Sequence, residues 1–175
     1  TWVAENLNYK RGFDNPAPLP INTSTKVAFY AKMDGVDFQY GNLQTTLPYR
    51  FDLTVKNKIK LKVFLPGFND FTKVEAKVAV KLQNSLLGGN SWQTQKEVAH
   101  TVTQFNQWIE LEFDFAAFSA ETVYDKIVVQ LGGEGHPHRR RADRQARGRI
   151  RGGEGGPGRQ DRAHPGRSPG HGGGI

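Results

Sequence analysis

The sequence predicts an all-β fold, an antiparallel β-sandwich, and three observations carry this prediction. Residues 58–115 contain three segments in which apolar and polar residues alternate. Turn-forming residues separate these segments and several shorter apolar ones at hairpin-like spacing. No segment of useful length has the period of an amphipathic helix. Strand side chains point to alternate faces, so each strand should bury one face, and two such sheets can close over a core.

The three central segments predict which residues form the core. Trp108 is also expected in the core, but its parity opposes its neighbours, so a β-bulge would be needed there. The residues expected to be buried are Ile59, Leu61, Val63, Leu65, Val74, Ala76, Val78, Val80, Leu82, Ile109, Leu111, Phe113 and Phe115. Those expected to face water are Lys58, Lys60, Lys62, Lys73, Glu75, Lys77, Ala79, Lys81, Glu110, Glu112 and Asp114.

Shorter elements are expected on either side of these segments. Residues 1–22 are dense in turn formers and are expected to be mostly loop. Asp34 and Gly35 predict a hairpin turn. Together with the central segments, the chain should contain about eight strands, as sandwiches do. The further strands are expected at residues 26–33, 37–43, 49–55, 92–103 and 124–131, and one helical turn at residues 116–121.

The net charge of +7 belongs to one end of the chain. Residues 1–135 hold 14 of the 24 Lys and Arg and 14 of the 17 Asp and Glu. Residues 136–175 hold the other 10 basic residues, all Arg, against 3 acids. We therefore expect an electrically balanced domain at residues 1–135 and a separate Arg/Gly/Pro-rich tail at residues 136–175.

The tail is expected to be disordered, because Ile150 and Ile175 are its only large apolar residues. An RNA-binding tail is one interpretation, but this segment has no aromatic residue for base stacking and no Lys. We favour a tail that is not native to the domain, because GC-rich DNA read out of frame encodes mainly Arg, Gly, Pro and Ala. No nucleic-acid partner is expected.

The remaining composition excludes several classes of site. The chain has no cysteine, which excludes disulfides and thiolate zinc sites. No apolar run approaches the ~18 residues of a membrane helix, so no membrane partner is expected. The chain starts at Thr1 without a signal-like segment, and we interpret it as a piece of a longer protein.

Three stretches together resemble motifs of secreted bacterial carbohydrate-binding modules. Residues 22–28 read NTSTKVA, residues 106–115 resemble N-x-W-x-x-L-x-F-D-F, and residues 124–129 resemble Y-D-K-I-V-x. The likeness covers about residues 12–135 and is to galactose-binding-like jelly rolls, which are often appended to polysaccharide hydrolases and lyases. It implies a secreted, non-catalytic domain whose partners are a polysaccharide and a parent catalytic domain.

The chain departs from this family at its end. There, an aromatic-acidic strand like F-Y-F-D-D-F follows a Gly-rich loop; here residues 131–135 supply the loop and the strand is missing. The sandwich should then lack its last strand and expose unpaired backbone and apolar surface. The resemblance also implies a structural calcium ion, for which Asp14 and Asn15 are the candidate ligands.

Sugar recognition needs exposed aromatic faces beside amide or acidic groups. Phe38 and Tyr40 share one face of an expected strand, with Gln39 on the other, although both aromatic residues could instead belong to the core. Trp92 follows a Gly-rich loop, and a large ring exposed at such a position is a candidate for ligand contact. The candidate carbohydrate-binding residues are Phe38, Gln39, Tyr40, Gln44 and Trp92.

Catalysis finds less support in the sequence. One strand face carries Glu110, Glu112 and Asp114, two of which could form a glycosidase pair. The solvent-exposed face of a sheet explains these acidic residues more simply. His100 has no nearby acid or cysteine. The predicted function is non-catalytic carbohydrate binding. The alternatives are a spacer or interaction domain of a cell-surface protein, and a small polysaccharide lyase or hydrolase.

Overall fold

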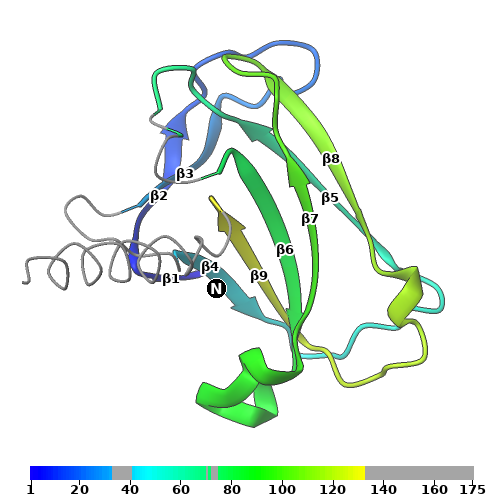
Figure 1. The fold of residues 1–175 in the computed structure, drawn as a ribbon. Coiled ribbons are helices and arrows are strands. Elements are labelled where there is room, and N and C mark those ends of the chain that lie inside the picture. The colour runs from blue at the N-terminus through cyan, green and yellow to red at the C-terminus, as the bar shows by residue number, and fades with distance from the viewer. Residues whose placement is uncertain (33–40, 70, 72–74, 133–175) are drawn as a thin grey trace, which may run out of the picture. The chain divides into compact units, whose positions relative to one another are not determined.

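Nine antiparallel strands form the framework of the part of the chain that the structure describes (Figure 1). This structure is a computed structural model, and it describes residues 1–32, 41–69, 71 and 75–132. All of these residues belong to one structural unit. The strands are β1 (Val3–Glu5), β2 (Leu7–Asp14), β3 (Lys26–Lys32), β4 (Asn42–Thr46), β5 (Lys58–Phe64), β6 (Lys77–Gln83), β7 (Lys96–Thr101), β8 (Trp108–Asp114) and β9 (Lys126–Leu131).

The strands form three antiparallel sheets. The largest has the order β1-β4-β9-β6-β7, while β2 pairs with β3 and β5 pairs with β8. Two 3₁₀ segments, η1 (Ser85–Thr94) and η2 (Ala116–Phe118), connect strands. The predicted all-β antiparallel class is confirmed, as is the helical turn after Phe115. None of the helices in the described ranges is long and apolar enough to cross a membrane.

The hydrophobic core joins the five-stranded sheet to the pair β5-β8. Leu82 of β6, Val63 of β5 and Phe113 of β8 are all buried in one cluster, together with Tyr124 just before β9. Each fully buried side chain of this size contributes about 1.5–3 kcal/mol relative to an exposed one. The cluster therefore holds together segments that lie far apart in the sequence. Its remaining buried members are Leu53, Leu65, Val78, Val80, Val102 and Phe115.

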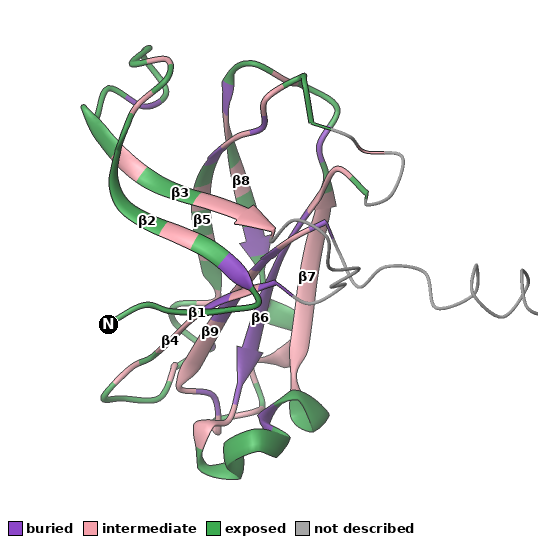
Figure 2. Cartoon of the chain, turned by 90° about the vertical axis from the view of Figure 1, so that its left-hand side faces the viewer, coloured by how far each residue is buried: buried purple, intermediate pink, exposed green. Residues whose placement is uncertain are grey.

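The interior strand β6 is buried on both faces (Figure 2), and here the predicted pattern is wrong. Ala79 and Lys81 were expected to face water but are buried like the apolar residues between them. In the sheet, β6 is hydrogen-bonded to β9 on one side and to β7 on the other. A buried ammonium group needs a partner. Lys81 Nζ lies 3.2 Å from a carboxylate oxygen of Glu97 on β7, and the other oxygen is 3.3 Å from Lys77 Nζ.

Other predicted elements are also corrected. Residues 1–22 are not mostly loop, because β1 and β2 lie there; the alternation in β2 is hidden by a register shift beside Gly12, which has a φ of 68°. The segment 49–55 forms a turn instead of a strand, held by the bond from Thr54 N to Asp52 Oδ1 of 3.1 Å. Residues 85–94 form η1, so the strand expected from residue 92 starts at Lys96.

Trp108 is buried as expected, but without a bulge. The pairing of β5 with β8 runs in regular register from Lys58 opposite Asp114 to Phe64 opposite Trp108. Trp108 is therefore on the face that carries Glu110, and the N-terminal loop covers it. Its indole Nε1 donates a 2.9 Å hydrogen bond to Asn15 Oδ1.

Several predictions lie outside the described residues. These are the turn at Asp34 and Gly35, the positions of Met33, Lys73 and Val74, and the character of the tail at residues 136–175. The expected strand at residues 37–43 is described only from β4 onward.

We expect Glu97→Gln to lower the free energy of unfolding by about 3 kcal/mol, because Lys81 would lose the carboxylate that faces its buried charge. The matched control is Glu110→Gln, which breaks a pair with Lys60 whose side chains are 43% and 59% exposed. The control should cost at most about 1 kcal/mol. Urea unfolding at neutral pH measures both, and equal losses would contradict the ion-pair account.

Candidate functional site

The predicted binding residues fall in three places. Phe38, Gln39 and Tyr40 lie outside the described residues. Trp92 lies in η1 with 61% of its surface exposed, the expected position for a sugar-stacking ring. Gln44 is in β4 and is half-buried. The structure therefore describes two of the five candidate residues, and they come from different elements.

The conformation of the 3₁₀ segment η1 is fixed by a cap, by a glycine and by an anchor to Asp125. Asn84 Oδ1 accepts a 3.1 Å bond from Leu86 N, which caps the first turn. Gly88 then adopts a φ of 56°, a conformation that side chains other than glycine rarely accept. Ser85 is anchored to Asp125, whose carboxylate accepts from its N (2.8 Å) and its Oγ (2.6 Å). The segment is thus fixed to the start of β9, and Trp92 projects from it into solvent.

The side of the five-stranded sheet that faces away from the core is polar. Residues directly opposite one another in an antiparallel sheet share a face. Gln44 is opposite Val128, which is opposite Lys81, which is opposite Glu97. We call this surface the polar face; its polar members are Asn42, Gln44, Thr46, Lys77, Lys81, Gln83, Glu97, Thr101, Lys126 and Gln130.

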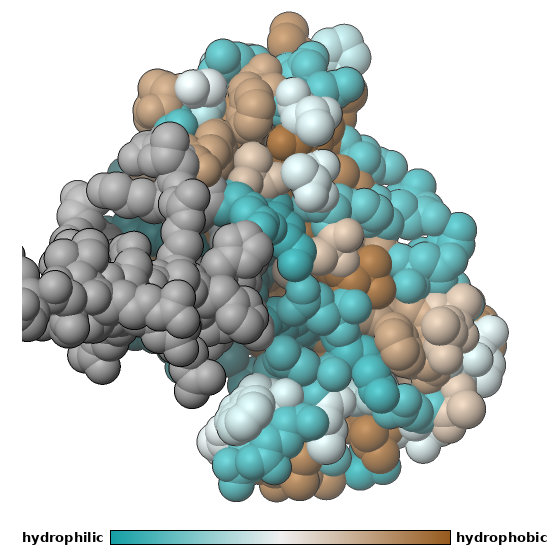
Figure 3. Space-filling view, in the orientation of Figure 1, coloured by the Kyte–Doolittle hydropathy of each residue, from teal (hydrophilic) through white to brown (hydrophobic). Residues whose placement is uncertain are grey.

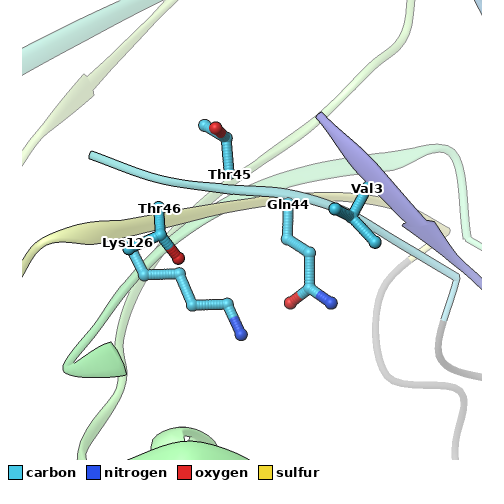
Figure 4. A pocket seen from close by; sticks show the side chains of 5 residues that line it. All are labelled: Val3, Gln44, Thr45, Thr46 and Lys126. Carbon is cyan, nitrogen blue, oxygen red and sulfur yellow. The ribbon is translucent and has the colours of Figure 1, made fainter. Parts of the chain in front are cut away.

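A hollow of about 140 Å³ lies at one end of the polar face (Figure 4). Val3, Gln44, Thr45, Thr46 and Lys126 line it. The side chains of Gln44, Thr46 and Lys126 extend to the same side of the sheet, and Thr45 points to the other. On this face Lys81, Gln83 and Gln130 are buried, whereas Thr46 is exposed and Gln44 and Lys126 are half-buried. The hollow is therefore the part that a ligand can reach.

A chain of contacts connects the hollow with Trp92. Lys126 is directly opposite Gln83 in the sheet. Gln83 Nε2 donates a 2.9 Å hydrogen bond to Gln95 Oε1, and Gln95 N donates to the carbonyl of Trp92 at 3.4 Å. These hydrogen bonds join the segment that carries Trp92 to the polar end of the sheet. We call the hollow together with Trp92 the candidate site.

The groups of the candidate site suit neutral hydroxylated ligands. The amide of Gln44, the hydroxyl of Thr46 and the ammonium of Lys126 donate or accept hydrogen bonds. An exposed indole ring can bury the C–H face of a sugar ring. Catalytic chemistry, in contrast, needs a titratable pair or a metal. No group of three or more His, Asp or Glu side chains in the described segments is arranged to hold a metal ion.

The acidic row on β8 is engaged in ion pairs. Glu112 Oε1 lies 2.6 Å from Lys58 Nζ, and Glu110 Oε1 lies 3.2 Å from Lys60 Nζ. The hydrogen bond from Lys58 holds the pKa of Glu112 below its ordinary value. A general acid needs a raised pKa, so Glu112 lacks the environment of a glycosidase acid. His100 Nε2 lies 2.8 Å from the carbonyl of Glu112, as a structural histidine does.

The residues proposed for calcium do not fit that ion. Asn15 Oδ1 already accepts from Trp108 Nε1 and from Ala17 N, both at 2.9 Å. Asp14 is exposed and bonded to Lys26, which lowers its pKa. Calcium takes six to eight oxygen ligands. The described geometry assigns Asn15 to fastening the N-terminal loop over Trp108, and the calcium ion stays an untested prediction.

Sequence reasoning missed most of the candidate site. Thr46 and Lys126 gave no motif, because each is an ordinary polar residue at a strand end. A signal was present in the alternation of Asn42, Gln44 and Thr46, which marks one polar strand face. Using it requires knowing that β4 pairs with β9 and β9 with β6, and this order is not visible in the sequence.

Comparison with known proteins gave no relative: no family model, no curated protein and no solved structure matches the chain.

We expect Asn15→Ala to lower the free energy of unfolding by about 2 kcal/mol, because it leaves the buried Trp108 Nε1 without its acceptor. The loss should be the same in excess calcium and in excess EDTA. Denaturant unfolding followed by tryptophan fluorescence measures it. A loss that appears only with calcium present would show that Asn15 binds the ion.

Proposed function

We propose that this chain is a non-catalytic carbohydrate-binding domain, a β-sandwich of jelly-roll type that holds a secreted polysaccharide-degrading enzyme on its glycan. The observation that carries the proposal is the exposed Trp92 ring in one region with the amide, hydroxyl and ammonium groups of the polar face. The strand motifs that resemble carbohydrate-binding modules support the same class. Attachment would act by raising the local concentration of the enzyme at its substrate.

In this proposal the ring supplies affinity, and the polar groups supply specificity. Trp92 would bury the apolar face of a pyranose, which supplies most of the affinity. Gln44, Thr46 and Lys126 would select ring hydroxyls at defined positions. A neutral or acidic glycan suits this set, because Lys126 is the only charged group lining the hollow.

A spacer or interaction domain is the second candidate. A sugar site would use both the exposed indole of Trp92 and the hydrogen-bonding groups of the hollow, and a spacer would need neither. A lyase or hydrolase is the third candidate. Two members of the acidic row that it would use, Glu110 and Glu112, are paired with lysines of β5.

Trp92→Ala should weaken glycan binding at least tenfold and leave stability within about 0.5 kcal/mol, because an exposed side chain contributes little to the core. Affinity electrophoresis against a panel of plant and algal polysaccharides measures the first quantity, and thermal unfolding the second.

The matched control for this substitution is Phe68→Ala. Phe68 is an exposed aromatic residue in the loop after β5, outside the candidate site, and its loss should leave glycan binding unchanged. Equal retardation of the wild type and both variants by every polysaccharide would refute the proposed site. Turnover of a substrate by the domain would refute the non-catalytic assignment.

A further inference from the structure

A second surface feature, unrelated to the candidate site, is a groove of about 1070 Å³ on the core side of the five-stranded sheet. We call it the acceptor groove. One wall is β3, the other is the stretch 61–66 of β5 and its following loop, and Leu43, Val129 and Leu131 line it from β4 and β9. Figure 3 shows hydrophobic residues gathered at the surface in the upper part of the view, where Figure 1 places β3 and the end of β5.

The groove runs along the backbone edges of two strands. All seven residues of β3, from Lys26 to Lys32, line it, and so do the consecutive residues 61–66. Side chains alternate between the faces of a strand, so a groove over one face would be lined by every second residue. An unbroken run indicates that the groove lies beside the strand itself.

Among the strands that the structure describes, none pairs with these edges. Within the described ranges β3 pairs with β2 alone, and β5 pairs with β8 alone. The edge of each strand that faces away from its partner therefore presents backbone N–H and C=O groups that another strand can bind. Such edges are the recognition surface in β-strand addition.

The walls of the groove are apolar, but lysines lie among them. The described residues that line the groove include four lysines (Lys26, Lys32, Lys62 and Lys77) and one acid, Glu75. Lys26 and Lys77 are paired with Asp14 and Glu97.

The amine of Lys32 differs from the others. Its Nζ is buried and has no hydrogen-bond partner in the part of the chain that the structure describes. Burial also lowers the pKa of this amine. A buried ammonium without a counter-ion is costly, so a carboxylate delivered to this position gains more than one delivered to an exposed lysine.

We propose that the acceptor groove binds an extended, acidic segment of a partner protein, which adds as a β-strand beside β3 and β5. Its backbone pairs with the open edges, its alternate apolar side chains contact the floor, and a carboxylate pairs with Lys32. A second copy of this chain fits poorly, because its β3 or β5 edge would bring further lysines to the same groove. An oligosaccharide would leave the apolar floor and the backbone edges without matching groups.

The test uses two labelled seven-residue peptides, the length of β3 and β5. One alternates valine with aspartate, and the control alternates valine with lysine. Fluorescence anisotropy should give at least tenfold tighter binding of the aspartate peptide to the whole chain. Amide hydrogen exchange with this peptide should slow in β3 and β5, the two strands with open edges. Equal affinity for both peptides, or slowing confined to other strands, would overturn the proposal.

The variant Lys32→Met tests peptide binding apart from stability. It should weaken binding of the aspartate peptide about tenfold. Its melting temperature should be unchanged or raised, because the substitution removes an unpaired buried amine. Lys126→Met is the matched control in the candidate site and should leave peptide binding unchanged. Unchanged binding in Lys32→Met, displacement of the peptide by a soluble glycan, or dimerisation of the free chain through β3 would each refute the assignment. The outcome is independent of whether Trp92 binds sugar.

Discussion

Burial of β6 on both faces is the constraint on which the described structure depends. Its apolar face, with Val80 and Leu82, is part of the cluster that fixes β5 and β8 to the five-stranded sheet. Its other face places Lys81 beside Glu97 of β7 and Gln83 within reach of Gln95. The same strand therefore contributes to the core on one face and, through Gln83, contacts Gln95 near Trp92 on the other. A polar residue in this position is stable only because its neighbours provide partners.

The sequence predicted those parts of the fold that local alternation determines. The segments that became β3, β5 and β8 alternate cleanly, and the structure has strands at each of them. Alternation shows that a strand has two kinds of face, but it does not show whether the polar face meets water. Lys81 is buried on an interior strand of the sheet, and sheet order depends on contacts distant in sequence. Likewise, the shift beside Gly12 hid β2, since a bulge interrupts the period.

The candidate site was predictable in part for the same reason. Trp92 could be identified because exposure of a large ring after a glycine-rich loop is a local feature, and the structure exposes it. Thr46 and Lys126 join it only through the pairing of β4, β9 and β6, which no motif encodes. The role of Asn15 was also out of reach, because its hydrogen bond to Trp108 spans 93 positions in sequence.

The most direct test of the account is a map of the surface that a glycan touches. Amide chemical shifts of the isotope-labelled chain would be followed by NMR during titration with soluble oligosaccharides from the polysaccharide panel. The account predicts shifts concentrated in η1 and at the adjoining ends of β4 and β9, with β3 and β5 unaffected. Shifts concentrated in β3 and β5, or no shifts with any glycan, would contradict it.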